Sequence, residues 1–172
     1  QVERAAFQSD DLTAPVTVLG QGHVELWLRP GATDTAIQVT LTEIRPDGIE
    51  VRVQSGFHRP VHNVEDETRS DDLRVDYTFV ADHRQDLVVG QWLHTRVPFM
   101  PVGHVFRAGS RLRVTVSTPG RDLPFWRFDN PVDEGVTHDV GRGGDHASAL
   151  VLPVWEGVEA PSEYPAPDSL RG

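Results

Sequence analysis

The side chains that could carry out nucleophilic catalysis gather near the end of the sequence, at His138, Asp139, His146 and Ser148. A hydroxyl, an imidazole and a carboxylate act together only when the fold brings them into one hydrogen-bonded row, and neighbours in sequence rarely converge in that way. No serine of the chain lies in the Gly-x-Ser-x-Gly turn that exposes a hydrolase nucleophile. We therefore expect ordinary hydrogen bonds at strand ends and predict no catalytic residue in this chain.

Metal ligation is the second chemistry that residue spacing could support. His58 and His62 form the only tightly spaced histidine pair. On a strand their imidazoles would be roughly 13 Å apart. Pro60 forbids the helix that would shorten this distance, so only a turn at Pro60 could bring the rings together. The acidic pairs Asp10-Asp11 and Asp71-Asp72 lack the oxygen-ligand frame of a calcium loop. We predict no metal site and no cofactor.

An aromatic cluster in a loop is the strongest candidate for a binding surface. Phe125, Trp126, Arg127 and Phe128 lie among charges and prolines, in a context that favours a long loop over a strand. Exposed aromatic rings are unfavourable in water, so they must be covered by the fold itself or by another surface. Two interpretations stay open: the rings plug one end of the fold, or they line an interface or a substrate cleft.

Composition excludes several classes of partner. The 172-residue chain has 26 acidic residues against 16 Lys and Arg, a formal net charge of −10. Such a charge repels phosphate backbones and anionic lipids, so we expect neither nucleic-acid nor membrane binding. Cysteine is absent, which excludes disulfides. No apolar run approaches the roughly 20 residues of a membrane span. The first residue is Gln1, from which we expect further residues upstream. The compartment is left open, with the cytoplasm slightly favoured.

The elements that must position these side chains are predicted to be β-strands. Apolar and polar residues alternate over residues 24–28 and 37–41, which is the period of a half-buried strand. The turn residues Arg45-Pro46-Asp47-Gly48 are followed by renewed alternation at Ile49, Val51 and Val53, which predicts a hairpin. Further strands are expected over residues 73–80, 92–99, 111–117 and 149–154.

Seven or eight short strands with almost no helix predict an all-β fold, an antiparallel sandwich or jelly roll. A chain of this length can bury a core as one domain. We assign residues 1–155 to this domain. Residues 156–172, which are rich in Pro, Ala and acidic side chains, are predicted to form a tail that is disordered or lies along a partner.

Five sequence blocks, in this order, resemble one known family. They are Gly22-His23-Val24-Glu25-Leu26-Trp27-Leu28 with Thr33-Asp34-Thr35, then Arg45-Pro46-Asp47-Gly48, Ser55-Gly56-Phe57-His58-Arg59, Phe106-Arg107-Ala108-Gly109-Ser110-Arg111-Leu112-Arg113-Val114 and His146-Ala147-Ser148-Ala149-Leu150-Val151-Leu152-Pro153-Val154. The resemblance is to the C-terminal domain of the X-Pro dipeptidyl-peptidase, cocaine esterase and α-amino acid ester hydrolase (CocE/NonD-type) serine hydrolases. Two departures stand out: Ser110 replaces a histidine usual in the family, and the aromatic loop is rearranged.

The resemblance implies a jelly-roll β-sandwich of the galactose-binding-domain-like kind. It also implies a partner, an α/β-hydrolase catalytic domain of the same protein that supplies Ser, Asp and His, and contacts between copies of the chain are possible. This chain is then a non-catalytic accessory domain of an acyl esterase or X-Pro dipeptidyl-peptidase. Within it, Phe125, Trp126, Arg127 and Phe128 are the candidates for the interface or the cleft wall. The alternative is a carbohydrate-binding β-sandwich module, in which an outward tryptophan such as Trp27 stacks on a sugar ring.

Overall fold

The computed structural model describes residues 4–120, 128–131 and 135–158, and in this part of the chain all regular elements longer than three residues are strands. The strands are β1 (Ala5–Gln8), β2 (Val16–Gly20), β3 (His23–Arg29), β4 (Ile37–Ile44), β5 (Glu50–His58), β6 (Leu93–Pro98), β7 (Val102–Phe106), β8 (Arg111–Ser117), β9 (Asp139–Val140), β10 (Arg142–Gly143), β11 (His146–Ala147), β12 (Ala149–Val151) and β13 (Val154–Trp155). Two 3₁₀ turns, η1 (Pro60–His62) and η2 (Ala81–His83), lie between β5 and β6.

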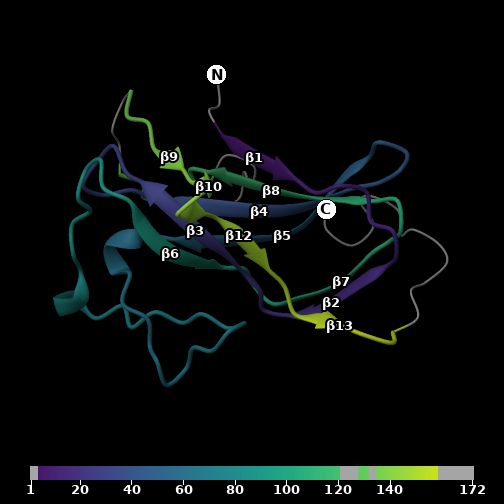
Figure 1. Ribbon diagram of the computed structural model, residues 1–172. Coiled ribbons are helices and arrows are strands. Elements are labelled where there is room, and N and C mark those ends of the chain that lie inside the picture. The colour runs from purple at the N-terminus through teal and green to yellow at the C-terminus, as the bar shows by residue number, and fades with distance from the viewer. Residues whose placement is uncertain (1–3, 121–127, 132–134, 159–172) are drawn as a thin grey trace.

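The strands form two facing layers (Figure 1). One layer is the antiparallel sheet β1-β8-β4-β5. The other contains the sheet β12-β3-β6, with β9 also paired to β3, and the sheet β13-β2-β7. Each strand of one of these two sheets continues along the chain into the strand at the same position of the other: β2 leads into β3, β6 into β7 and β12 into β13. The second layer is therefore three long strands that all bend at one line.

Glycine and proline account for this bend. Gly20 has a φ of 129°, and a side chain on Gly22 would collide with the backbone oxygen of Val151 on the neighbouring strand. Pro101 and Pro153 interrupt the two flanking strands at the same level. Close backbone approach and missing N–H donors end the ladder, and each strand resumes in a new direction.

Alternation of side chains builds the core between the layers. The side chains of Val24, Leu26 and Leu28 on β3 face those of Val39 and Leu41 on β4, and all are buried. The rest of the buried cluster comes from β2, β4, β5, β6, β7, β8 and the start of the bend: Val18, Ile37, Val53, Val97, Phe99, Phe106, Val114 and Val116. The predicted antiparallel β-sandwich is confirmed, and its jelly-roll connectivity stays a prediction.

The predicted hairpin is present in detail. Arg45 and Ile49 close the turn through an N–H to carbonyl hydrogen bond of 2.9 Å, and Gly48 adopts a φ of 84° that favours glycine. The Asp47 carboxylate accepts the Ile49 N–H at 2.9 Å, as short polar side chains do in turns. The strands predicted over residues 92–99, 111–117 and 149–154 also form, the last one divided into β12 and β13.

The strand predicted over residues 73–80 is wrong. Val75 and Tyr77 are buried, with exposed fractions of 2% and 6%, but Leu73 is 40% and Phe79 66% exposed, so the four side chains do not share one face. Only Tyr77 forms a bridge, with Glu65. The strands β1, β2, β7, β9, β10 and β11 were not predicted from the sequence.

Gly56 tests how closely the two layers meet at the bend. It forms a bridge with Phe99, and a Cβ at this position would lie inside van der Waals contact of the Pro98 backbone oxygen. We expect Gly56→Ala to reduce the free energy of unfolding by about 3 kcal/mol, because backbone cannot yield as a flexible side chain does. Gly143→Ala, which meets only open space, should stay close to the parent chain in the same urea titration. Equal stability of the two variants would contradict the packing described.

Candidate functional site

The residues singled out for nucleophilic catalysis do not converge. Ser148 Oγ donates to the Gly141 carbonyl at 2.6 Å and accepts the Trp27 N–H at 3.0 Å. Asp139 forms an ion pair with Arg29 at 2.6 Å. His138 accepts the Gly31 N–H at 3.2 Å. Each of these side chains therefore fixes the segment from residue 138 to 148 onto β3 and the loop that follows it, as expected for hydrogen bonds at strand ends.

A hydroxyl, a carboxylate and an imidazole do meet elsewhere, at Ser110, Glu43 and His104. Ser110 Oγ donates to Glu43 Oε1 at 2.7 Å, and His104 Nε2 donates to Glu43 Oε2 at 2.9 Å. The carboxylate lies between the other two groups, so no imidazole is placed to take a proton from the hydroxyl, as a catalytic triad requires. Ser110 and Glu43 are both fully buried. This cluster is structural.

The electrostatics of Glu43 agree with a structural role. Burial on its own would raise the pKa of Glu43, but hydrogen bonds from His104 and Ser110 outweigh it and hold that pKa below its usual value. The carboxylate therefore stays charged inside the sandwich. It connects β4 with β7 and with the turn before β8. Sequence reasoning had noted Ser110 as a departure from the related family without connecting it to Glu43.

Of the two histidines His58 and His62, His58 has a structural role. The 3₁₀ turn at Pro60 forms, but His58 is buried, stacks on Tyr77 with ring centroids 4.0 Å apart and bonds Asn63 Oδ1 at 3.3 Å. Burial lowers the pKa of His58 to about 4, so the imidazole is neutral. Among the described residues no group of three or more His, Asp or Glu side chains has the geometry to hold a metal ion.

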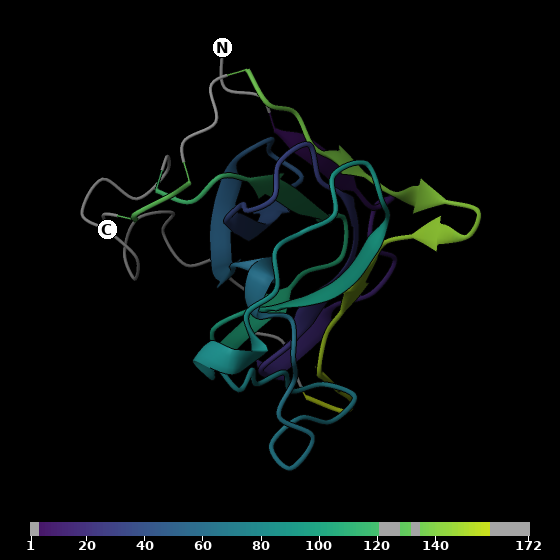
Figure 2. The same cartoon turned by 90° about the vertical axis from the view of Figure 1, so that its left-hand side faces the viewer.

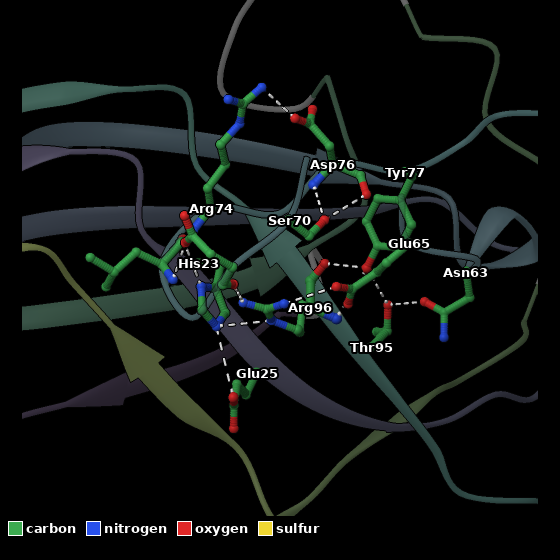
Figure 3. A network of polar contacts seen from close by, with 12 residues as sticks. His23, Glu25, Asn63, Glu65, Ser70, Arg74, Asp76, Tyr77, Thr95 and Arg96 are labelled. Carbon is green, nitrogen blue, oxygen red and sulfur yellow. Dashed lines mark hydrogen bonds and ion pairs between the residues drawn. The ribbon is translucent and has the colours of Figure 1, made fainter. Parts of the chain in front are cut away.

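A network of polar contacts is centred on Arg96 (Figure 3). The Arg96 guanidinium donates to Glu65 Oε2 at 2.8 Å, to the Asp71 carbonyl at 2.6 Å and to His23 Nε2 at 3.3 Å. Because His23 Nε2 accepts this bond, its Nδ1 carries the proton and donates to the Leu73 carbonyl at 3.2 Å. Burial lowers the pKa of His23, which favours this neutral form.

The same network covers the free edge of β6. The Tyr77 hydroxyl donates to the Arg96 carbonyl at 2.6 Å and accepts the Arg96 N–H at 3.2 Å, and Asn63 donates to the His94 carbonyl at 3.0 Å. β6 ends the sheet β12-β3-β6, and an open edge offers unpaired backbone groups to other chains. The segment from residue 63 to 92 therefore closes this edge. The residues of this segment and their partners on β6 lie far apart in sequence. The alternation of Val75 and Tyr77 was therefore the only sequence signal that the segment is partly buried.

The predicted aromatic loop falls mostly outside the described residues. Phe125, Trp126 and Arg127 lie in the part of the chain that the structure does not describe. Phe128 is half-buried and packs on Phe57 of β5, with ring centroids 4.8 Å apart. The assignment of these four residues to an interface or a cleft stays a prediction.

Trp27, the candidate for sugar stacking, lies in an aromatic cluster. His94 and His146 contact its ring, at centroid distances of 5.0 and 4.8 Å. His146 also stacks on Trp92 at 4.5 Å, and the Arg29 guanidinium lies 5.3 Å from the Trp92 centroid. A sugar ring would have to compete with these neighbours for the indole, so the geometry does not favour a stacking platform.

An apolar pocket of about 180 Å³ opens between the two layers at their β1 and β12 edge. Core side chains make up most of its wall, among them Phe7, Leu26 and Val114. The polar groups at its wall include Ser148, whose hydroxyl already bonds Gly141 and Trp27. The pocket is a gap in sandwich packing and brings no reactive groups together. No helix in the described residues is long and apolar enough to cross a membrane.

The fold and its polar clusters define a β-sandwich whose ionisable groups hold the structure together. Residues 2–149 match the family described as the X-Pro dipeptidyl-peptidase C-terminal non-catalytic domain. The chain belongs to this family, and the resemblance stated from the five sequence blocks is confirmed. Among curated proteins no sequence matches this chain.

Solved structures agree on the fold. A CocE/NonD family hydrolase from Staphylococcus aureus matches with a TM-score of 0.73 and 18% identity, over 88% of this chain and 30% of that chain. An aminopeptidase from a marine sediment Thaumarchaeota archaeon matches at 0.65 and 19%, over 88% and 26%. An α-amino acid ester hydrolase matches at 0.64 and 20%, over 88% and 25%. The chain thus spans under a third of these proteins.

Tyr77→Phe tests whether the network holds the 63–92 segment. The variant removes a buried hydroxyl and leaves the Arg96 carbonyl without its donor, so we expect a loss of about 1–2 kcal/mol in the free energy of unfolding. Amide hydrogen exchange over residues 63–78 should become faster than in the parent chain. Arg29→Gln, which breaks an exposed ion pair, is the control and should change stability by less than about 1 kcal/mol. Unchanged exchange in Tyr77→Phe would show that the segment is held otherwise.

His58 predicts a pH dependence of stability. Its pKa is about 4 in the folded chain and 6.5 in the unfolded one, so the unfolded state takes up a proton that the folded state refuses between these values. This stability is complete above pH 6.5 and is lost as the pH falls to 4, a change of about 3 kcal/mol. The unfolding free energy of His58→Gln should fall less over this range, whereas the exposed His94→Gln should follow the parent chain. Parallel curves for the parent and His58→Gln would refute the assignment.

Proposed function

We propose that this chain is the accessory domain of an α/β-hydrolase-type serine hydrolase that cleaves acyl bonds, in esters or in X-Pro peptides. The domain packs on the catalytic domain of the same protein and shapes its substrate cleft. The observation that carries this proposal is the Ser110, Glu43 and His104 cluster. In this cluster a hydroxyl, a carboxylate and an imidazole meet, which are the three groups of a catalytic triad. The buried Ser110 hydroxyl donates to the Glu43 carboxylate and not to the His104 imidazole, so the cluster is structural and not catalytic.

The contact surface that we propose from the sequence is formed by Phe125, Trp126, Arg127 and Phe128. Phe128, the one of these four residues in the described part of the chain, supports it, because its ring packs on Phe57 near the end of β5. Aromatic side chains and arginine dominate the buried centres of interfaces. Contacts between copies of the chain through this domain are a further part of the proposal.

The division of labour predicts where activity resides. The isolated chain should not hydrolyse p-nitrophenyl esters faster than its Ser110→Ala and Ser148→Ala variants, since the Ser110 hydroxyl donates to the Glu43 carboxylate and the Ser148 hydroxyl to the Gly141 carbonyl. In the full-length protein a fluorophosphonate probe should label a serine outside these 172 residues, as mapped by peptide mass spectrometry. Turnover by the isolated chain that Ser148→Ala abolishes would refute the proposal. Denatured chain serves as the control for hydrolysis catalysed by exposed histidines.

A further inference from the structure

The segment from residue 63 to 92, between η1 and β6, exposes apolar side chains. Within the described part of the chain, six of the twelve exposed large hydrophobic residues belong to it: Val64, Leu73, Phe79, Val80, Val88 and Val89. The segment extends from the sandwich at the lower left of Figure 1 and at the bottom of Figure 2. Scattered exposed residues need no explanation, but this concentration in one segment indicates an interaction surface.

Phe79 is the most exposed of these residues and its backbone is strained. Its side chain is 66% exposed, and it is the single non-glycine residue with positive φ in the described chain, at 48°. A bulky non-glycine residue rarely adopts this left-handed conformation, which strains its backbone. The Tyr77 ring is buried against His58, whereas the Phe79 ring stays largely exposed and meets the rings of Tyr77 and His62 at centroid distances of 6.1 and 6.0 Å. The fold therefore holds an apolar ring in water at a cost, and such strain is typical of functional sites.

The segment is fixed before any partner binds. The hydrogen bond between Tyr77 and Arg96 connects the middle of the segment to β6. Near its end, Arg84 pairs with Asp34 at 3.3 Å, and Asp34 also pairs with Arg59 at 2.6 Å. The Thr78 hydroxyl bonds His83 Nδ1 at 2.8 Å beside Phe79 itself. A surface that is already ordered loses little conformational entropy on association.

Charge selects the kind of partner. Residues 62–92 contain eight acidic residues and three arginines, a net charge of −5, which is half of the −10 of the whole chain. Among them Glu67, Asp72 and Asp82 form no ion pair within the described residues. Two copies meeting through this surface would bring −5 against −5, and anionic lipid would be repelled as well. The fitting partner is apolar at its centre and basic around it.

We propose that the surface formed by Phe79 and Val80 docks on the catalytic domain of the same protein, against an apolar patch with a basic rim. This inference rests on the proposed function and adds a second contact surface to the one proposed from the sequence. Phe79 is the anchor, and the acidic residues of the segment form the rim. The surface is distinct from Phe128, although Phe128 and the segment contact neighbouring residues, Phe57 and His58, at the end of β5.

Hydroxyl-radical footprinting of the full-length protein tests this surface. Side-chain oxidation is normalised to the same peptide in the unfolded protein, and Trp155 (56% exposed) and Leu19 (50% exposed), both on the β13-β2-β7 sheet, are internal controls. We expect Phe79 to be oxidised several-fold more slowly than a phenylalanine that is 66% exposed, whereas both controls should be oxidised at the rates that their exposed fractions predict. If Phe79 is oxidised freely while Phe128 or Trp155 is protected, the docking surface is wrong and the accessory function stands. If no exposed residue is protected, both proposals fail.

Phe79→Asn provides the second measurement. Asparagine tolerates positive φ better than phenylalanine, so the fold of this domain should be kept while the apolar anchor is lost. In the full-length protein the variant should separate one thermal transition into two, whereas Leu19→Asn should not. A single transition in both variants overturns the proposal. Protection of Phe79 that disappears on dilution, together with a dimer that dissociates, would assign the surface to a second copy and overturn the choice of partner.

Discussion

The structure depends on the burial of β4 on both of its faces. Seven of its eight residues are buried, although every second side chain is polar. The inner face, with Val39 and Leu41, supplies the core. The outer face carries Gln38 and Thr40, whose polar atoms must find hydrogen bonds because they are removed from water. Gln38 donates to Thr40 at 3.0 Å and accepts the Gly120 N–H at 3.2 Å, so the chain that leaves β8 is fixed over this face.

Residues that elsewhere perform catalysis here hold segments together. Glu43 is a charge inside the sandwich, where removal from water costs several kcal/mol unless hydrogen bonds offset it. Its partners come from β7 and from the turn before β8, so satisfying one carboxylate fixes three elements. Arg96 does the same for the 63–92 segment and His23. Such groups are poor nucleophiles or bases because their protons and lone pairs are already committed.

Sequence reasoning recovered what is local and missed what is distant. The hairpin at residues 45–48 follows from proline and glycine at fixed places, and β8 follows from alternation over residues 111–117. Val75 and Tyr77 also alternate, but Tyr77 is held by Arg96 and His58, and no local pattern reports those contacts. A two-residue period means only that buried side chains alternate with less buried ones. A loop that is fixed by long-range contacts can show this pattern as well as a strand does.

The end of β5 supports both the ring of Phe128 and the segment that carries Phe79. Phe57 and His58 are consecutive on a strand, so they point to opposite faces. Phe57 receives Phe128 on the outer face, while His58 stacks on Tyr77 and so supports the segment that carries Phe79. The following residue, Arg59, pairs with Asp34, which also binds Arg84. Two residues of β5 and the residue that follows it thus hold Phe128 and the 63–92 segment. Because β5 is bonded along its length to β4, of which seven residues are buried, a partner that meets Phe79 is positioned against the core itself.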